Sequence, residues 1–366
     1  MKEDKQEYHY IDNDIKLLEF IDFIRSNNYQ DCAIDTEADS LHCYEEKLCL
    51  IQFATSDTLA IIDPLSIKDL SPLIGYLDTV TVWLHGSDFD IRMFSRSFGK
   101  VPSIIYDTQT ASRLLGVRKF GLVNLVEDHF GVLLPKSSQK ANWGMRPLSD
   151  KMLKYAINDV RYLLEIAENL SGRLKDLSRW SWFVESCAHT KSVASQIKDK
   201  DPELIWRISG WGKLERQGMA FLRQLWFWRD NEAAKRDKPT FKIIGNQELL
   251  KMAHHLEDGK DVKLPDRFPS GPVKRFDAAI DKVHQMDEGD YPKIEKRKRK
   301  KKNPDFDSRF NKLKAFRDKL SIDLGIDPTL IASRGIMEGI SHDPTKFGEY
   351  LLNWQQDLLS PCLEKF

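Results

Sequence analysis

Residues 32–37, Cys-Ala-Ile-Asp-Thr-Glu, place two carboxylates inside an apolar segment. The segment predicts a β-strand, and side chains two positions apart on a strand point to the same face. Acidic residues are depleted in strands, and two like charges on one half-buried face repel each other and are poorly solvated. A divalent cation between Asp35 and Glu37 removes both problems, because hard ions such as Mg²⁺ bind carboxylates and substrate phosphates. The stretch therefore predicts a metal-dependent phosphoryl site.

The composition is that of an ordinary globular chain rather than a membrane or disulfide-rich protein. With 366 residues, it is expected to form two or three domains. The formal net charge is +0, so any attraction for nucleic acid has to come from local patches. The five cysteines are an odd number without a Cys-x-x-Cys pair, which favours a reduced, cytoplasmic protein. The charged N-terminus lacks an apolar signal core, and no stretch of 18 apolar residues is present.

Local patterns divide the chain into an α/β part and helical parts. Strands are predicted at 31–37, 47–54, 58–63 and 80–85, and helices at 87–98, 107–115, 121–130 and 149–171, with Asp107 and Ser149 as helix N-caps. The segments 202–290 and 305–358 are predicted to be helical, with a loop over 261–272. We expect an α/β domain over 1–195, a helical domain over 205–290, a basic linker over 291–304 and a second helical segment over 305–366.

One further acidic pair and one tyrosine–aspartate pair accompany the first. The run 82–94 passes from strand to helix and carries Asp88 and Asp90, and either could simply favour a helix N-terminus. Tyr155 and Asp159 lie four residues apart on a predicted helix, so their side chains share a face. Taken alone, such a Tyr–Asp pair is usually a surface contact.

Together, the Asp-x-Glu strand, the His-Gly-x-Asp-x-Asp run at 85–90 and Tyr155-x3-Asp159 resemble the motifs of the DEDD 3′→5′ exonucleases. The tyrosine of the third motif favours the subgroup named after it. The match also includes the segments 48–52, 62–64 and 107–111. The segments 136–139 and 143–149 point to the ribonuclease D branch, although Asn142 departs from the aspartate common there. The resemblance implies an α/β fold, with a ribonuclease H-like mixed-sheet exonuclease domain followed by all-α HRDC-like domains.

The resemblance also implies a site with two divalent ions, Mg²⁺ or Mn²⁺. Asp35, Glu37 and Asp159 would hold the ion that activates water. Asp35 and Asp90 would hold the second, while Asp88 is the alternative ligand and otherwise a helix cap. Tyr155 would orient the attacking water, because an ordinary tyrosine pKa of about 10 makes it a poor base.

Substrate contacts are expected around this site. In relatives the loop after Glu37 touches the terminal nucleotide, which would give that role to Leu41, His42 and Tyr44, although an ordinary polar loop is the alternative. Further candidates are His85, Lys136, Trp143 and Arg146. A histidine at a strand end is more often packed or hydrogen-bonded than a metal ligand.

The helical part carries a second resemblance. Residues 216–250 are similar to the HRDC module shared by RecQ-type helicases and ribonuclease D, and 308–340 could be a second, divergent copy. The apolar positions of 222–229 follow helical spacing, so the aromatic residues are expected in the core rather than on a base-stacking surface. The seven basic residues 296–302 read as a solvated linker, or as a docking site for phosphates.

The sequence therefore predicts a 3′→5′ exoribonuclease that releases 5′-mononucleotides from structured RNA ends, with tRNA precursors as expected substrates. One alternative is a DNA-directed or general exonuclease. An alternative of another class is a catalytically silent RNA-binding protein. We expect no membrane partner and favour a monomer. No Gly-x4-Gly-Lys-Ser/Thr loop is present, so no helicase motor is predicted.

Overall fold

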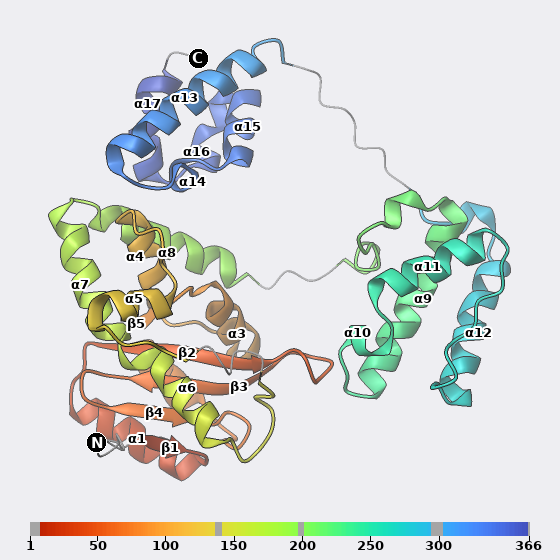
Figure 1. Ribbon diagram of the computed structural model, residues 1–366, viewed down its shortest axis with the longest axis horizontal. Coiled ribbons are helices and arrows are strands. Elements are labelled where there is room, and N and C mark those ends of the chain that lie inside the picture. The colour runs from red at the N-terminus through yellow and green to blue at the C-terminus, as the bar shows by residue number, and fades with distance from the viewer. Residues whose placement is uncertain (1–7, 136–140, 197–200, 294–302, 365–366) are drawn as a thin grey trace. The chain divides into compact units, whose positions relative to one another are not determined.

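The computed structural model describes residues 8–135, 141–196, 201–293 and 303–364 (Figure 1). The chain divides into two compact units. The first comprises Met1–Glu37, Leu48–Ile197 and Lys300–Phe366, and the second comprises Ala38–Lys47 and Lys198–Arg299. Within the described residues, no helix is both long and apolar enough to cross a membrane. The five cysteines, all described, are buried and form no disulfide.

A six-stranded mixed sheet organises the first unit, and it contains the four strands that the sequence predicts together with two further short ones. Its strands are β1 (His9–Ile11), β2 (Asp31–Asp39), β3 (Lys47–Ala54), β4 (Leu59–Ile62), β5 (Thr81–Leu84) and β6 (Ile104–Asp107), in the order β1-β4-β3-β2-β5-β6. β3 and β4 pair antiparallel, whereas β1–β4, β2–β5 and β5–β6 pair parallel. The strand that carries Asp35 and Glu37, β2, therefore has a neighbouring strand on each side.

The helices around this sheet are α1 (Asp14–Ser26), α2 (Ser71–Leu77), α3 (Asp88–Phe98), α4 (Thr108–Leu114), α5 (Leu122–Phe130), α6 (Asp150–Arg161), α7 (Leu163–Asp176) and α8 (Trp180–Ala194). Both predicted N-caps are confirmed. The Asp107 carboxylate accepts from the Gln109 and Thr110 amides, and Ser149 accepts from the Met152 amide. The prediction of one helix over 149–171 is wrong, because α6 ends at Arg161 and α7 begins at Leu163. The ring of Tyr162, between the two helices, packs on Phe130 with the ring centroids 5.0 Å apart.

The two faces of the sheet are covered by different helices. On one face, Phe20 of α1 meets the edge of the Phe53 ring of β3, with centroids 5.4 Å apart. On the other, Ala33 of β2 and Ala54 of β3 pack with Val160 of α6 in one buried cluster. Figure 1 shows α6 lying across β3 and β4. Because side chains alternate along a strand, Asp35 and Glu37 share the α6 face with Ala33.

The C-terminal helices have a small core of their own and are part of the first unit. They are α13 (Phe306–Leu324), α14 (Pro328–Ile331), α15 (Arg334–His342), α16 (Phe347–Tyr350) and α17 (Asn353–Leu363), with a 3₁₀ turn at Pro344–Lys346. The buried Arg179 guanidinium donates to the carbonyls of Leu114 and Leu324, both at 2.7 Å. The Trp182 and Trp354 rings stack at 4.9 Å.

The second unit is helical, with α9 (Arg216–Lys235), α10 (Thr240–Ile243), α11 (Asn246–Glu257) and α12 (Ser270–His284), and 3₁₀ turns at Trp211–Lys213 and Glu288–Asp290. Leu222, Leu225 and Trp226 are buried, which confirms that the aromatic run builds a core. The predicted loop over 261–272 extends too far, because α12 begins at Ser270. Pro272 lies in its first turn, where a missing amide proton breaks no helical hydrogen bond.

Candidate active site

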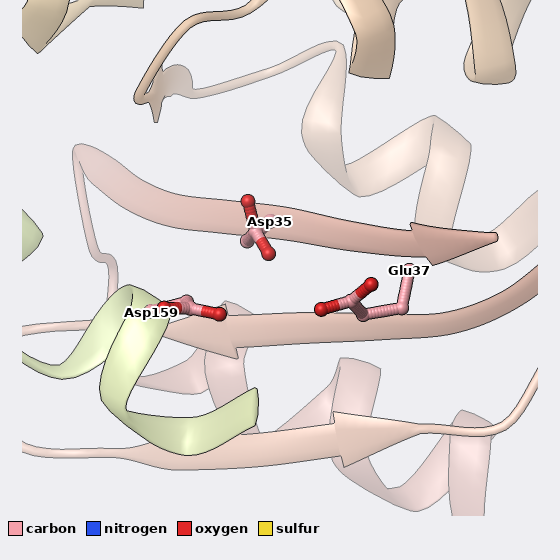
Figure 2. A group of neighbouring side chains, drawn as sticks. All are labelled: Asp35, Glu37 and Asp159. Carbon is pink, nitrogen blue, oxygen red and sulfur yellow. The ribbon is translucent and has the colours of Figure 1, made fainter. Parts of the chain in front are cut away.

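Three carboxylates from two elements converge on the α6 face of the sheet. Asp35 and Glu37 of β2 and Asp159 of α6 each offer an oxygen, and these oxygens lie within 4.8 Å of one another. Figure 2 shows the three side chains turned toward one point, two from the strand and one from the helix. These residues lie up to 124 positions apart in the sequence, and the fold brings them together.

Local structure explains why Asp159 reaches this point. Ala156, Ile157 and Val160 of α6 are buried against the sheet. Helix periodicity then sets Tyr155 and Asp159, one turn apart, along the border of that buried face. The Tyr155 hydroxyl lowers the pKa of the Asp159 carboxyl, and the Tyr155 ring lies 6.1 Å from that of Trp143. The pair expected from sequence to be a surface contact when taken alone is thus part of the acidic site.

The three carboxylates of the cluster are close together, and their pKa values are raised. Burial, followed by the charges of Asp90, Asp159 and Glu37, raises the pKa of Asp35 well above its ordinary value. Burial and the Asp159 charge raise the pKa of Glu37 to about 9. Burial also raises the pKa of Asp159 to about 7, against the opposing hydrogen bond from Tyr155. A cation that bound here would favour the ionised forms of all three groups.

Asp90 lies beside this cluster but is not one of the three converging groups. It sits in the first turn of α3, is buried, and accepts a hydrogen bond from Thr36 Oγ1 at 2.6 Å. Burial raises its pKa to about 7. Among neighbouring charges, Asp90 contributes most to the raised pKa of Asp35. Asp88, by contrast, is exposed and forms an i,i+4 ion pair with Arg92.

The turn that leads into α3 is held by a residue whose second role the sequence reasoning missed. Asp107 accepts from the Gly86 amide at 2.9 Å and from the Ser87 amide at 3.0 Å, in addition to capping α4. Gly86 has a φ of +77°, which favours glycine. Asp107 thus fixes the backbone just before Asp90. The only sequence signal was its place after a strand, which the N-cap interpretation already explained.

The loop residues expected to contact substrate have varied surroundings. The Leu41 side chain is exposed, and His42 Nδ1 lies 2.8 Å from an Asp39 oxygen. Tyr44 is held within the second unit, where its amide donates to Asp237 and its hydroxyl donates to Asp230. Lys136 lies outside the described residues.

Trp143 and Arg146 are engaged in the fold, so we assign them structural roles in place of the expected substrate contacts. Trp143 is only 1% exposed, within the cluster that joins β3 to α6. Arg146 makes two hydrogen bonds to Asp63, at 2.5 and 2.7 Å, and donates to the Cys49 carbonyl at 2.7 Å. Through these hydrogen bonds, the Arg146 guanidinium connects the segment before α6 to β3 and to the end of β4.

The donor set fits a hard divalent cation. All three converging groups are carboxylates, the ligands that Mg²⁺ and Mn²⁺ prefer, whereas a soft-metal site would need thiolate or imidazole ligands. The raised pKa values also indicate acids whose charge is not balanced by the groups around them. The site can therefore hold a cation and present it to a phosphate group.

Comparison with known proteins agrees with this geometry. A family model described as a 3'-5' exonuclease matches residues 8–175, and one described as an HRDC domain matches residues 218–261. Ribonuclease D of Musicola paradisiaca is 32% identical over 271 residues, covering 71% of each chain. Ribonuclease D of Pseudomonas paraeruginosa is 26% identical over 346 residues, covering 90% of each. The crystal structure of Escherichia coli RNase D, described as an exoribonuclease involved in structured RNA processing, superimposes with a TM-score of 0.74 at 25% identity over 98% of both chains.

Proposed function

This chain belongs to the ribonuclease D family and is a 3′→5′ exoribonuclease, and we propose that it trims structured RNA from the 3′ end, with tRNA precursors among its substrates. The products are 5′-mononucleotides. The observation that carries the site assignment is the convergence of Asp35, Glu37 and Asp159 within 4.8 Å. The description of the Escherichia coli relative as an enzyme of structured RNA processing supports the substrate class.

We assign two divalent cations, Mg²⁺ or Mn²⁺, to this site. Asp35, Glu37 and Asp159 hold one of them, and Asp35 and Asp90 hold the other. When bound, two such ions stabilise the attacking and leaving oxygens of a phosphodiester displacement. Asp90 is supported as a ligand by its burial beside Asp35, whereas Asp88 is turned to solvent and paired with Arg92.

Tyr155 positions the attacking water rather than deprotonating it. Burial and the neighbouring carboxylates raise the pKa of its hydroxyl, so the group keeps its proton at neutral pH. A protonated hydroxyl beside Asp159 can hold a water molecule by a hydrogen bond, which restricts its approach to the phosphorus. The chain's carboxylates must in turn lose their protons before a cation can bind.

The HRDC domain and the loop 38–47 are assigned to substrate recognition. Leu41 is exposed on that loop, whereas the His42 ring hydrogen-bonds to Asp39 and the Tyr44 hydroxyl donates to Asp230. The basic run 296–302 and Lys136 lie outside the described residues and are proposed only as phosphate contacts from their charge. We also propose that the protein is a cytoplasmic monomer. The assignment of 305–366 as a second HRDC-like copy stays a prediction.

The function is tested with a tRNA-like RNA that carries a 3′ tail, labelled at its 5′ end, and with the DNA of the same sequence. With Mg²⁺ we expect a ladder of single-nucleotide steps on RNA, and none when EDTA replaces the metal. Equal ladders on DNA would shift the proposal to a general 3′→5′ exonuclease. An RNA ladder that persists in EDTA would contradict the metal-dependent site.

A further inference from the structure

Two side chains from the strands that flank β2 contain buried polar atoms without a hydrogen-bond partner among the described residues, Gln52 on β3 and His85 directly after β5. Gln52 of β3 is 0% exposed, and neither its Oε1 nor its Nε2 is bonded. The Nε2 atom of His85, directly after β5, is buried and also lacks a partner. A buried polar group left unsatisfied destabilises a fold, so each such group requires an explanation. The mechanism above uses neither side chain.

Strand register places His85 beside Asp35. β2 and β5 pair in parallel, with Ala33 opposite Trp83. Extending this register by two residues, one residue past the end of β5 at Leu84, brings His85 opposite Asp35. Because paired positions in a sheet share a face, the imidazole lies on the same face as the Asp35 carboxylate.

Gln52 lies on the other side of Asp35. β2 and β3 are neighbours joined by residues 40–46, which are too few for a parallel crossover, so the two strands run antiparallel. Ala33 and Ala54 meet in one buried cluster under α6. Asp35 lies two residues after Ala33 and Gln52 lies two residues before Ala54, so both side chains are on the α6 face of neighbouring strands. Asp35 is thus flanked in the sheet by two incompletely bonded side chains.

The hydrogen bonds around His85 define what its free atom can do. The Thr108 hydroxyl donates to the Leu84 carbonyl at 3.1 Å, so its oxygen is an acceptor for His85 Nδ1–H at 2.9 Å. In a neutral imidazole whose Nδ1 carries the proton, Nε2 is an acceptor with an open lone pair. Since Thr108 directly follows β6, on the far side of β5 from β2, the Nε2 end of the ring is turned away from β6.

We infer that Gln52 and His85 are positioning residues that flank Asp35, the Gln52 amide donating to its carboxylate and His85 Nε2 accepting from a water molecule when the site is loaded with cation. This inference rests on the proposed metal-dependent function. It explains why the sheet tolerates both incomplete groups, because their partners arrive with the cation. Groups that orient metal ligands commonly change metal affinity roughly 10–100-fold when removed.

The test measures Mn²⁺ affinity and stability on the full chain. Gln52→Met keeps the length of the side chain and removes both amide atoms. His85→Asn keeps a donor for Thr108 and removes the acceptor at the Nε2 position, whereas His85→Gln retains a polar atom there. Mn²⁺ affinity is measured by titration calorimetry, and the melting temperature is measured in EDTA. His129→Gln is the matched control, because both nitrogens of His129 already have partners, Leu125 and Asn169.

We expect Gln52→Met and His85→Asn to weaken Mn²⁺ binding at least about tenfold, while the metal-free melting temperature stays unchanged or rises. His85→Gln should recover part of the affinity, and His129→Gln should match the wild type. Unchanged Mn²⁺ affinity in both Gln52→Met and His85→Asn would overturn the inference. Weaker Mn²⁺ binding together with a lower melting temperature in EDTA would also overturn the inference, since the residues would then be purely structural. A wild-type chain that binds no Mn²⁺ would instead overturn the proposed function.

Discussion

The carboxylates of Asp63 and Glu37 are both shielded from solvent, but they have opposite neighbours. Asp63 lies beside the cation of Arg146, and Glu37 lies beside the acid Asp159. Burial raises the pKa of Asp63, but the hydrogen bonds and charge of Arg146 outweigh it and leave that pKa below its ordinary value. For Glu37, burial and Asp159 act in the same direction and raise the pKa to about 9. Glu232 of the second unit behaves like Asp63. Burial raises its pKa, but Arg275 and Arg236 lower it below the ordinary value.

The contrast separates structural from functional acids in one chain. At Asp63 and Glu232, which support the fold, the protein supplies a guanidinium partner, and at Asp107 it supplies backbone amides. At Asp35, Glu37 and Asp159, the nearest charges are other carboxylates. An ion from solution can supply the missing positive charge, and a phosphodiester can then approach it. The predictions below test this distinction in order of the expected effect.

The largest effect is expected from Asp159→Asn. Removing one ligand carboxylate should lower the rate of RNA hydrolysis at least about a thousandfold, which corresponds to roughly 4 kcal/mol of lost transition-state stabilisation. Because the substitution also removes a repelling charge, the metal-free protein should melt at the same or a higher temperature. Single-turnover hydrolysis of labelled RNA and thermal melts in EDTA provide the two readouts. A variant that retains wild-type activity would contradict the role of Asp159.

Asp63→Asn should show the opposite pattern. It leaves Arg146 partly buried without its anionic partner, so we expect a loss of about 3 kcal/mol in the free energy of unfolding. The folded fraction should keep its Mn²⁺ affinity, because Asp63 does not belong to the converging carboxylates. Urea unfolding followed by circular dichroism measures the first quantity and calorimetry the second. Full stability in this variant would remove the contrast on which the distinction rests.

The response of stability to pH gives a smaller effect. The pKa of Glu37 is raised from an ordinary 4.5 to about 9 in the folded, metal-free chain. Its protonated form therefore stabilises the fold below about pH 4.5, and this contribution is lost as pH rises toward 9. We expect the melting temperature in EDTA to fall between about pH 6 and 9, and the increase produced by Mg²⁺ to grow over the same range. A Mg²⁺ effect that shrinks as pH rises would contradict the account.

Asp88→Asn is expected to have the smallest effect and resolves the choice between two neighbouring acids. Its exposed ion pair with Arg92 contributes between about 0 and 1 kcal/mol, so activity and stability should stay near wild type. Asp90→Asn, measured alongside it with the same labelled RNA, should lose most activity. The reverse ranking would move the second ligand assignment to Asp88.

The sequence predicted the parts of the site that depend on local periodicity. Alternation along a strand placed Asp35 and Glu37 on one face, and helical spacing joined Tyr155 to Asp159. Their meeting came from the resemblance of the three motifs to a known family, because no local pattern links residues more than a hundred positions apart. The roles of Asp107 and Arg146 were missed for the same reason, since these partners lie 20 to 97 positions away.

One helix and two short strands of the first unit were not predicted, although the helix has a clear sequence signal. The helix Asp14–Ser26 buries Leu17, Phe20, Ile21 and Ile24, which follow helical spacing. The strands His9–Ile11 and Ile104–Asp107 contain three and four residues, too few for alternation to be distinguished from chance. Their positions are determined by pairing with β4 and β5, a non-local interaction.

The central claim is that Asp35, Glu37 and Asp159 form a cation site that the protein itself leaves uncompensated. The most direct test is a crystal structure of the full chain grown with Mn²⁺, with the ion located by its anomalous scattering. The account predicts a peak within ligand distance, about 2.0–2.3 Å, of oxygens from all three carboxylates. An ordered crystal that places Mn²⁺ elsewhere, with these three oxygens bonded only to protein groups, would contradict it.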